Sequence, residues 1–438
     1  MNVTVSPGSL TGEVSAPSSK SEAHRLLICA AFAPGTTDID CTTTSDDIDA
    51  TARCLEALGA HITRTRRGFR VVPVPGTSAT DNIPAPATGA LLDCGESGST
   101  LRFLLPVVAA LGCEASLTGH GRLPQRPLSP LYEELVAHGV GLTPQGQVPL
   151  RVSGRLRPGR FSLPGNVSSQ YVSGLLLAAP LMGAPTEVVV SEPVESLPYI
   201  GITVAALARF GVTVDEGRTE DSGAPARSYV VGGAERLSSP GTVSVGGDWS
   251  GAAFWLAAGA LSEAGVSVRG LDVRSTQGDR QVLAALALLG ARVLRGSEGA
   301  ACAHDALAGR VIDVSNCPDL VPPLAAVAAL AEGTTRITGA ARLRLKESDR
   351  LETVSAAICA LGGRARATDD GLVIEGVREL AGGTVDAAGD HRIAMMAAVL
   401  AARCTRPVTI LGAECVAKSY PGFFEDLGRL GGTYRKES

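Results

Sequence analysis

The stretch Lys346-Glu347-Ser348-Asp349-Arg350 places two cations and two carboxylates within five residues. In a helix, Lys346 and Arg350 would share a face at the i, i+4 spacing, with Glu347 beside Lys346. A carboxylate next to two fixed cations can act as an acid or a base on an anionic substrate. Alone, such a stretch is more often a solvated helix face with a surface ion pair. The motifs elsewhere in the chain therefore have to decide between these interpretations.

Several other expected helices begin with hydroxyl, carboxylate, amide or cationic side chains. Free backbone N–H groups at a helix start attract anions, and nearby hydroxyls and cations strengthen that attraction. Each segment alone fits an ordinary capped helix or a surface loop equally well, and we interpret His24 as structural. Together they indicate a site for a small substrate with several phosphate or carboxylate groups. The candidate residues are Lys20, Ser21, Arg25, Gly98, Arg126, Ser168, Ser169, Gln170, Ser196, Asp319, Arg392 and Lys418.

Two of the candidate segments differ from a capped helix start: one is a glycine-rich turn and the other is an arginine before a proline. The turn Cys94–Arg102 is rich in glycine and runs into a helix, so its backbone could approach an anion closely, although it lacks the GK[ST] of a P-loop. Arg126 precedes a proline, which keeps its backbone extended and aims its side chain outward. Asp46-Asp47 opens another helix, where the helix dipole alone accounts for acidic residues.

A repeated pattern supplies the elements that position these residues. Six helix-like runs end in a glycine followed by a β-like stretch, with glycines at 59, 139, 211, 290, 362 and 431 and an apolar residue four positions before each. The pattern predicts helices that end at a glycine and bury one face. A near-constant spacing of 69 to 80 residues indicates repeated α/β units, three before about position 240 and three after. Two similar domains predict a ligand cleft.

Composition excludes several classes of protein. The chain has 438 residues, 45% hydrophobic and 4% aromatic, with a net charge of −5. That charge gives no general attraction to nucleic acid or to acidic lipid. The N-terminus lacks a signal-peptide pattern and the apolar runs are too short to span a bilayer, so we expect a cytoplasmic protein. Ten cysteines without a CxxC pair are interpreted as small buried hydrophobic residues rather than disulfides or zinc ligands.

Read in order, the motifs match one known family over essentially the whole chain. They are SKSEAHR, SDD, GESGSTLR, RLPQRPL, SSQ, SxPY, PD, KESDR, DHRIAM and AKSYP. With them the chain resembles the 5-enolpyruvylshikimate-3-phosphate synthase family. The resemblance implies an α/β fold of two similar domains, each of three βαβαββ units, with a cleft between them. It also implies that the chain crosses twice, with one domain formed by residues 20–241 and the other by 1–19 and 242–438.

The family transfers the enolpyruvyl group of phosphoenolpyruvate to the 5-hydroxyl of shikimate 3-phosphate and releases phosphate. The resemblance implies a monomer without a metal or organic cofactor. The shikimate 3-phosphate ligands that it implies are Lys20, Ser21, Arg25, Ser168, Ser169, Gln170, Ser196, Asp319 and Lys346. The implied phosphoenolpyruvate ligands are Lys20, Gly98, Arg126, Gln170, Arg350, Arg392 and Lys418.

The resemblance also assigns catalytic roles. Asp319 resembles the base that takes the 5-hydroxyl proton, Lys346 would hold the substrate hydroxyls, and Glu347 resembles the acid that protonates the methylene carbon. The chain departs from the family pattern at three places: Arg342 replaces an asparagine, Phe103 a proline and Leu197 a lysine. Gly98 is kept where glyphosate-tolerant members often have alanine, so glyphosate is expected to compete with phosphoenolpyruvate.

Three alternatives remain to be weighed. The sister enzyme that uses UDP-N-acetylglucosamine has a catalytic cysteine a few residues before an Arg-Pro, whereas Cys113 lies thirteen residues before Arg126. That enzyme's N-terminal Lys-Asn pair is also missing. A paralogue acting on another cyclitol phosphate would use the same chemistry. A sugar-phosphate-binding protein without activity would have no need of Asp319 or Glu347.

Overall fold

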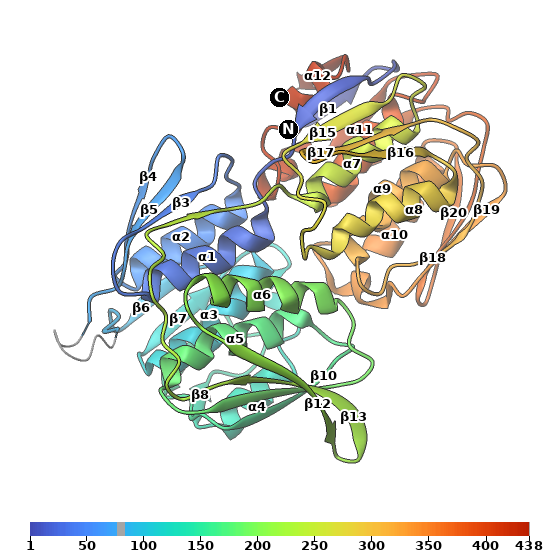
Figure 1. The fold of residues 1–438 in the computed structure, drawn as a ribbon. Helices are drawn as coiled ribbons and strands as arrows, with labels where there is room; N and C mark the ends of the chain where they lie inside the picture. Colours follow the sequence, from blue (N-terminus) through green and yellow to red (C-terminus); the bar gives the residue numbers. More distant parts are fainter. Residues whose placement is uncertain (77–83, 438) are drawn as a thin grey trace. The chain divides into compact units, whose positions relative to one another are not determined.

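The computed structural model describes residues 1–76 and 84–437 and has an α/β fold (Figure 1). The chain divides into two compact units. Unit 2 is the continuous segment Lys20–Val245, and unit 1 combines Met1–Ser19 with Gly246–Ser438. Each unit contains three four-stranded sheets.

The second repeat of unit 2 shows the pattern that all six sheets follow. Strand β6 (Ala90–Asp93) is parallel to β7 (Ala115–Thr118), and α3 (Gly98–Leu111) connects them. Helix α4 (Leu131–Ala137) then leads to β8 (Val140–Leu142) and β9 (Leu150–Gly154). Because β9 inserts between β7 and β8 and is antiparallel to both, the order is β6-β7-β9-β8. This is the predicted βαβαββ unit.

The other two repeats of unit 2 have the same strand order. The first comprises α1 (Lys20–Phe32), β3 (Thr37–Asp40), α2 (Asp46–Ala57), β4 (His61–Arg64), β5 (Gly68–Val72) and β14 (Thr242–Ser244). The third comprises β10 (Arg160–Pro164), α5 (Ser169–Met182), β11 (Thr186–Ser191), α6 (Leu197–Arg209), β12 (Val214–Asp221) and β13 (Ala224–Val231). The returning chain thus supplies β14, which lies parallel to β3 and completes the first sheet.

Unit 1 repeats the arrangement three more times. The fourth repeat comprises β2 (Gly12–Ser15), α7 (Trp249–Ala260), β15 (Val266–Arg269), α8 (Val282–Leu289), β16 (Arg292–Arg295) and β17 (Gly299–Ala303). The fifth comprises β18 (Val311–Asp313), α9 (Val321–Ala328), β19 (Thr334–Thr338), α10 (Arg350–Ala360), β20 (Arg364–Thr368) and β21 (Gly371–Glu375). The sixth comprises β22 (Gly383–Asp386), α11 (His391–Ala401), β23 (Val408–Leu411), α12 (Phe423–Arg429), β24 (Tyr434–Glu437) and β1 (Asn2–Val5).

The N-terminal segment belongs to two of these sheets. β1 is antiparallel to both β23 and β24, so it lies inside the last sheet. β2 is parallel to β15 and forms the edge of the fourth sheet. Short 3₁₀ turns connect other elements: η1 (Leu123–Gln125), η2 (Gly278–Gln281), η3 (Pro318–Leu320), η4 (Ala341–Leu345) and η5 (Ala413–Lys418).

The six predicted helix ends are confirmed. The glycines at 59, 139, 211, 290, 362 and 431 all have φ between 79° and 107° and follow the second helix of each repeat. The apolar residues four positions earlier are all fully buried: Leu55, Leu135, Leu207, Leu286, Ile358 and Leu427. Only glycine adopts this left-handed conformation without a steric cost, which is why the same residue recurs.

The first helix of each repeat forms the core. In unit 2, α3 packs along α5, and in unit 1 the helices α7, α9 and α11 contact one another. These helices are buried over nearly their whole length, which explains why they carry alanine and leucine on every side. At Gly174 in α5 a Cβ would collide with the backbone oxygen of Arg102, so glycine permits the close approach of α3.

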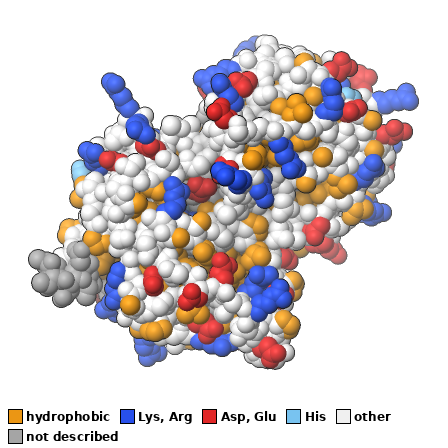
Figure 2. All heavy atoms as spheres, in the orientation of Figure 1, with side chains coloured by type: hydrophobic (Ala, Val, Ile, Leu, Met, Phe, Trp, Pro, Cys, Tyr) orange, Lys and Arg blue, Asp and Glu red, His pale blue; other side chains and the backbone are white. Residues whose placement is uncertain are grey.

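Nine of the ten cysteines are buried, as expected for small hydrophobic residues, but Cys359 is exposed near the end of α10. The prediction of burial was wrong for Cys359, because this side chain lies on the outer face of α10, away from the buried residues of the helix. On the face shown in Figure 2, Lys and Arg side chains are interspersed with Asp and Glu. Within residues 1–76 and 84–437, every helix is too short or too polar to cross a bilayer.

The cap glycines provide a test of the repeat. In Gly290→Ala the left-handed backbone costs about 1–2 kcal/mol, and a Cβ colliding with the backbone oxygen of Ala306 adds about 1–3 kcal/mol. Gly333 also has a positive φ, but a Cβ there would meet only open space. Urea unfolding should therefore show a larger loss of stability for Gly290→Ala than for Gly333→Ala. Equal losses would contradict the packing described for the end of α8.

Candidate active site

The centre of the polar cluster in unit 1 is the side chain of Arg350, which is 1% exposed. Its guanidinium contacts three carboxylates: Asp319 at 2.9 Å, Glu347 at 2.6 Å and Asp390 at 2.9 Å. A buried guanidinium is tolerated only when its N–H groups are paired in this way.

The three carboxylates come from the starts of different helices. Asp390 is the N-cap of α11 and accepts a hydrogen bond from the backbone N of Arg392. Asp319 lies in η3, directly before α9, and Glu347 lies between η4 and α10. The repeat architecture brings these helix starts together, although Asp319 and Asp390 are 71 residues apart in the chain.

Asp319 is bound by cations. Its carboxylate contacts Arg350 and Arg392 at 2.9 Å each and Lys346 at 3.8 Å. Burial alone would raise the pKa of Asp319, but Arg392, Lys346 and Arg350 outweigh burial and hold this pKa well below its usual value. For Arg350, burial opposes the charge, but Asp390, Glu347 and Asp319 prevail and raise its pKa. Asp319 is therefore anionic in this arrangement.

The KESDR stretch is not a continuous helix, which corrects the conditional expectation for Lys346 and Arg350. Lys346 is the C-cap of η4, and Asp349 is the N-cap of α10, which begins at Arg350. The Asp349 side chain accepts a hydrogen bond from the backbone N of Glu352. Lys346 and Arg350 nevertheless converge, because both contact Asp319 rather than sharing a helix face.

Lys418 lies near the same helix starts. Its Nζ donates to the backbone oxygen of Gly389, at 2.7 Å, immediately before the Asp390 cap. The structure thus gathers four of the predicted residues of unit 1, Lys346, Glu347, Arg350 and Arg392, around Asp319 and places Lys418 at the start of α11. Arg342, the departure from the family pattern, donates to the backbone oxygen of Ser315 at 3.0 Å.

Sequence reasoning missed Asp279, a buried acid in η2. The hydroxyl of Ser250 donates to its carboxyl group. Burial, followed by the charge of the nearby Asp319, raises the pKa of Asp279 to about 7, although Arg392 opposes the change. No sequence signal distinguished this residue from an ordinary polar turn. Asp390 was also not among the candidate site residues, although its position directly before HRIAM indicates a helix cap.

In unit 2, most of the predicted anion ligands lie in the first turns of α1, α3 and α5, whereas Arg126 follows η1 and Ser196 precedes α6. Lys20, the first residue of α1, forms an ion pair of 2.7 Å with Asp47 in the first turn of α2. Our interpretation of Asp47 as a helix-dipole residue was therefore incomplete, because its carboxylate also holds Lys20. The low exposure of both side chains, 16% and 11%, makes this pair more than a surface contact.

Gln170 connects α5 to α3. Its side-chain oxygen accepts from Arg102 at 2.8 Å, and its amide donates to the Ser99 hydroxyl at 3.0 Å. The space at the start of α3 is tight, because a Cβ on Gly98 would lie 2.6 Å from Nη1 of Arg126 and 3.0 Å from Nη1 of Arg102. Two guanidinium groups therefore border the Gly98 backbone, an arrangement suited to a phosphate or a carboxylate.

Two local predictions are confirmed, the extended backbone of Arg126 and the helix start at Ser168. Arg126 has an extended backbone, with φ −73° and ψ 131°, as expected before proline. Ser168 caps α5 by accepting from the backbone N of Gln170, so Ser169 and Gln170 form the first turn. Ser196, before α6, has φ 54° and does not cap the helix through its side chain. A non-glycine residue in this conformation carries strain of the kind often found at functional sites.

Arg25 is almost fully buried, 2% exposed. It donates to the hydroxyls of Thr203 and Ser173 and to the backbone oxygens of Ser21 and Tyr199. Its guanidinium also lies 4.6 Å from the centre of the Phe103 ring, so the replacement of proline by Phe103 provides a cation–π contact. Burial lowers the pKa of Arg25 to about 10, although Tyr199 and Glu22 oppose the change. Its role as a substrate ligand stays a prediction.

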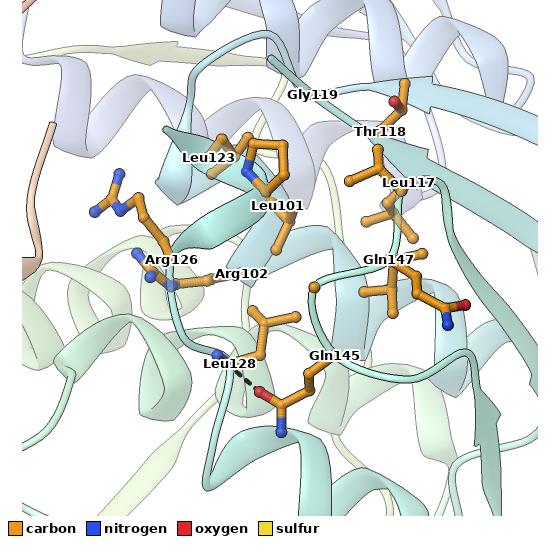
Figure 3. A pocket seen from close by; sticks show the side chains of 14 residues that line it. Leu101, Arg102, Leu117, Thr118, Gly119, Leu123, Arg126, Leu128, Gln145 and Gln147 are labelled. Atoms are coloured by element: carbon orange, nitrogen blue, oxygen red, sulfur yellow. Dashed lines mark hydrogen bonds between the residues drawn. The ribbon is translucent and has the colours of Figure 1, made fainter. Parts of the chain in front are cut away.

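A pocket in the second repeat lies beside Arg102 and Arg126, the two arginines that border the Gly98 backbone. Figure 3 shows Arg102 and Arg126 on one side of it and Gln145 and Gln147 on another. Most of the remaining lining is apolar, from residues such as Leu101, Leu117, Leu123, Leu128 and Leu150. An apolar lining does not suit a polyanion, so we assign the anion-binding chemistry to the helix starts and not to this pocket.

The carboxylates around Arg350 generate a prediction. Asp390→Asn keeps a capping side chain but removes the charge partner of a buried guanidinium, which should cost about 2 kcal/mol because two other carboxylates remain. Asp248→Asn is the matched control, since Asp248 is also a buried N-cap in unit 1, at α7. Asparagine caps nearly as well, so the control should lose less than about 1 kcal/mol. Similar denaturation midpoints for both variants would refute the role given to Asp390.

Comparisons with known proteins indicate the family to which the chain belongs. The model of the family described as EPSP synthase (3-phosphoshikimate 1-carboxyvinyltransferase) matches residues 5–427. A Clostridium kluyveri protein named 3-phosphoshikimate 1-carboxyvinyltransferase is 40% identical, covering 98% of this chain and 97% of the relative. A Clostridium acetobutylicum protein of the same name is 38% identical, with coverage of 98% and 97%.

A solved structure supports the same relationship. The EPSP synthase of Acinetobacter baumannii superposes with a TM-score of 0.79 at 28% identity, covering 99% of this chain and 100% of that protein. The family model spans nearly the whole chain, the relatives match at full length, and the fold agrees. The chain belongs to the EPSP synthase family.

Proposed function

We propose that this protein transfers the enolpyruvyl group of phosphoenolpyruvate to the 5-hydroxyl of shikimate 3-phosphate and releases phosphate, as a step of aromatic amino acid biosynthesis. The observation that carries this proposal is the cluster in unit 1, where a candidate base, Asp319, and a candidate acid, Glu347, contact the same buried Arg350. The names of the full-length relatives support the choice of substrates.

The cations answer the first physical requirement, which is to hold two polyanions together. In unit 2, Lys20, Arg126 and the Gly98 turn would bind phosphate or carboxylate groups. In unit 1, Arg350, Arg392 and Lys418 would bind such groups. Such fixed charges act before the reaction begins, so little reorganisation is needed in the transition state. Ser21, Arg25, Ser168, Ser169, Gln170 and Ser196 would complete the shikimate 3-phosphate site.

Substrate binding would also activate the base. Without substrate, Arg350 and Arg392 both donate to Asp319 and keep its pKa low, which makes Asp319 a weak base. When an anionic substrate takes over N–H groups of these arginines, Asp319 loses stabilisation of its charge and its pKa rises. The base would therefore become effective only in the presence of phosphoenolpyruvate.

The chemical steps use these groups in order. Asp319 removes the proton of the 5-hydroxyl while this oxygen forms a bond to C2 of phosphoenolpyruvate. A protonated Glu347 transfers its proton to C3, which gives a tetrahedral intermediate. The C2–oxygen bond to phosphate then breaks, phosphate leaves with the bonding electrons, and C3 returns a proton to the Glu347 carboxylate, which restores the double bond. Lys346, 3.8 Å from Asp319, would hold the hydroxyl groups of shikimate 3-phosphate beside the base.

We further propose that the protein acts as a monomer in the cytoplasm. All ten cysteines are free thiols, which suits a reducing compartment.

The alternative that uses UDP-N-acetylglucosamine is not favoured. Cys113, the cysteine nearest to Arg126 in sequence, follows the end of α3, whereas Gly98 is at its start. A helix of 14 residues separates its two ends by about 21 Å. Cys113 is also buried, which raises the pKa of its thiol. It is therefore poorly placed to replace Glu347 as the acid.

The decisive experiment measures phosphate release from phosphoenolpyruvate with shikimate 3-phosphate as acceptor, and with UDP-N-acetylglucosamine in parallel. We expect turnover only with shikimate 3-phosphate. Glu347→Gln should lower kcat by at least about 100-fold, because a positioned acid contributes roughly that factor. Glu352→Gln, in the first turn of α10, controls for a change of charge nearby. Turnover with the sugar nucleotide, or with neither acceptor, would reject the assignment.

The tight space around Gly98 predicts a selective effect on phosphoenolpyruvate. In Gly98→Ala the new Cβ must displace Arg126, so the KM for phosphoenolpyruvate should rise about tenfold, equivalent to roughly 1.4 kcal/mol. Glyphosate should compete with phosphoenolpyruvate in the unaltered protein and inhibit Gly98→Ala more weakly. Gly201→Ala is the control, because a Cβ there would meet open space. Inhibition that is independent of phosphoenolpyruvate concentration would contradict a shared site.

A further inference from the structure

A buried chain of hydrogen bonds connects the first three helices of unit 2. Nδ1 of His24 in α1 lies 2.7 Å from the Thr51 hydroxyl in α2, which lies 2.7 Å from the Thr100 hydroxyl in α3. Thr100 in turn donates to the Ser97 hydroxyl at 2.8 Å. All four side chains are at most 1% exposed. Neither the family resemblance nor the proposed mechanism assigns a role to His24, Thr51 or Thr100.

The donors along this chain can be assigned. The Thr100 hydrogen is directed to Ser97, with the backbone oxygen of Asp47 at 3.4 Å as its other acceptor. In either case Thr51 must donate to Thr100, and His24 must then donate to Thr51 from Nδ1. Burial, followed by the charges of Lys20 and Arg25, holds the pKa of His24 well below its usual value. A neutral imidazole protonated at Nδ1 satisfies these conditions.

The chain ends at the groups proposed to bind phosphoenolpyruvate. Ser97 is the N-cap of α3 and accepts from the backbone N of Thr100 at 3.2 Å, and Gly98 follows directly. Asp47, whose carboxylate pairs with Lys20, lies in the first turn of α2, one turn before Thr51. The hydrogen bonds therefore connect the helix that carries Lys20 with the turn that presents Gly98. The charged groups facing this region are Lys20, Arg25 and Asp47.

We propose that His24 and Thr51 are positioning residues, which hold the starts of α1, α2 and α3 together so that Lys20 and the Gly98 turn form a preorganised site for phosphoenolpyruvate. This inference rests on the proposed function. A helix start that is free to shift must be ordered when the anion binds, and this ordering reduces affinity. Neither residue touches the substrate, so the chemical step itself does not require them.

Thr51→Val is the main test, because valine keeps the shape and removes the hydroxyl. The change leaves the His24 donor and the Thr100 acceptor without their partner, and a buried donor or acceptor that loses its partner is destabilised. We expect the KM for phosphoenolpyruvate to rise about tenfold, equivalent to roughly 1.4 kcal/mol, while kcat stays within about twofold. Thr51→Ser restores the hydroxyl and should restore the KM.

Thr335→Val is the matched control. Thr335 is also fully buried, lies in unit 1, and its hydroxyl has no hydrogen-bond partner among the residues that the structure describes. The control should leave the KM unchanged. His24→Leu is a second test, which removes the first donor and keeps both threonines paired, and it should weaken phosphoenolpyruvate binding in the same direction.

Direct binding separates this inference from the proposed function. Each variant is combined with Glu347→Gln in the same chain to slow turnover, and phosphoenolpyruvate is titrated into it calorimetrically with shikimate 3-phosphate present. A tenfold weaker Kd for Thr51→Val, recovered in Thr51→Ser, supports the positioning role. The positioning role would be overturned if Thr51→Val and His24→Leu bound phosphoenolpyruvate as tightly as the parent protein. It would also be overturned if Thr51→Ser lost as much affinity as Thr51→Val. Absence of phosphate release by the unaltered protein would instead reject the proposed function.

Discussion

The burial of Arg350 is the interaction on which the polar centre of unit 1 depends. One guanidinium that is nearly inaccessible to water holds Asp319, Glu347 and Asp390, which belong to three separate segments. Removing such a charge from water is costly, and each of the three carboxylates offsets part of that cost. The same contacts keep Asp319 charged. Structural stability and the readiness of the candidate base are therefore determined by one set of hydrogen bonds.

The two units use one architecture for different chemistry. In both, the inner helix of each repeat is apolar over most of its length and carries most of its polar residues in its first two turns. Unit 1 has Asp248 and Asp390 as caps of α7 and α11, and Asp319 just before α9. Unit 2 has Ser97 and Ser168 as caps of α3 and α5. The carboxylates of unit 1 attract arginines, whereas the hydroxyls of unit 2 leave its helix starts suited to anions.

Buried polar side chains in unit 2 act as connections between helices. Arg25 joins α1 to α5 and α6 through Ser173 and Thr203, and Gln170 joins α5 to α3 through Ser99 and Arg102. The chain from His24 to Ser97 joins α1, α2 and α3 in a similar way. Apolar contacts between small residues allow helices to slide, whereas hydrogen bonds of fixed geometry define one arrangement. Anion ligands on separate helices require such definition.

The sequence by itself determined the repeat, because glycine is required wherever a helix ends in the left-handed conformation, and the spacing of Gly59 to Gly431 made that requirement visible. It also identified most polar helix starts, since capping is a local property. Only the tertiary structure decided that Asp47 holds Lys20, that Asp390 and Asp279 belong to the Asp319 cluster, and that KESDR is interrupted before α10. Ion pairs between residues far apart in the chain, and the pKa values that follow from them, depend on how the helices pack, which no local pattern records.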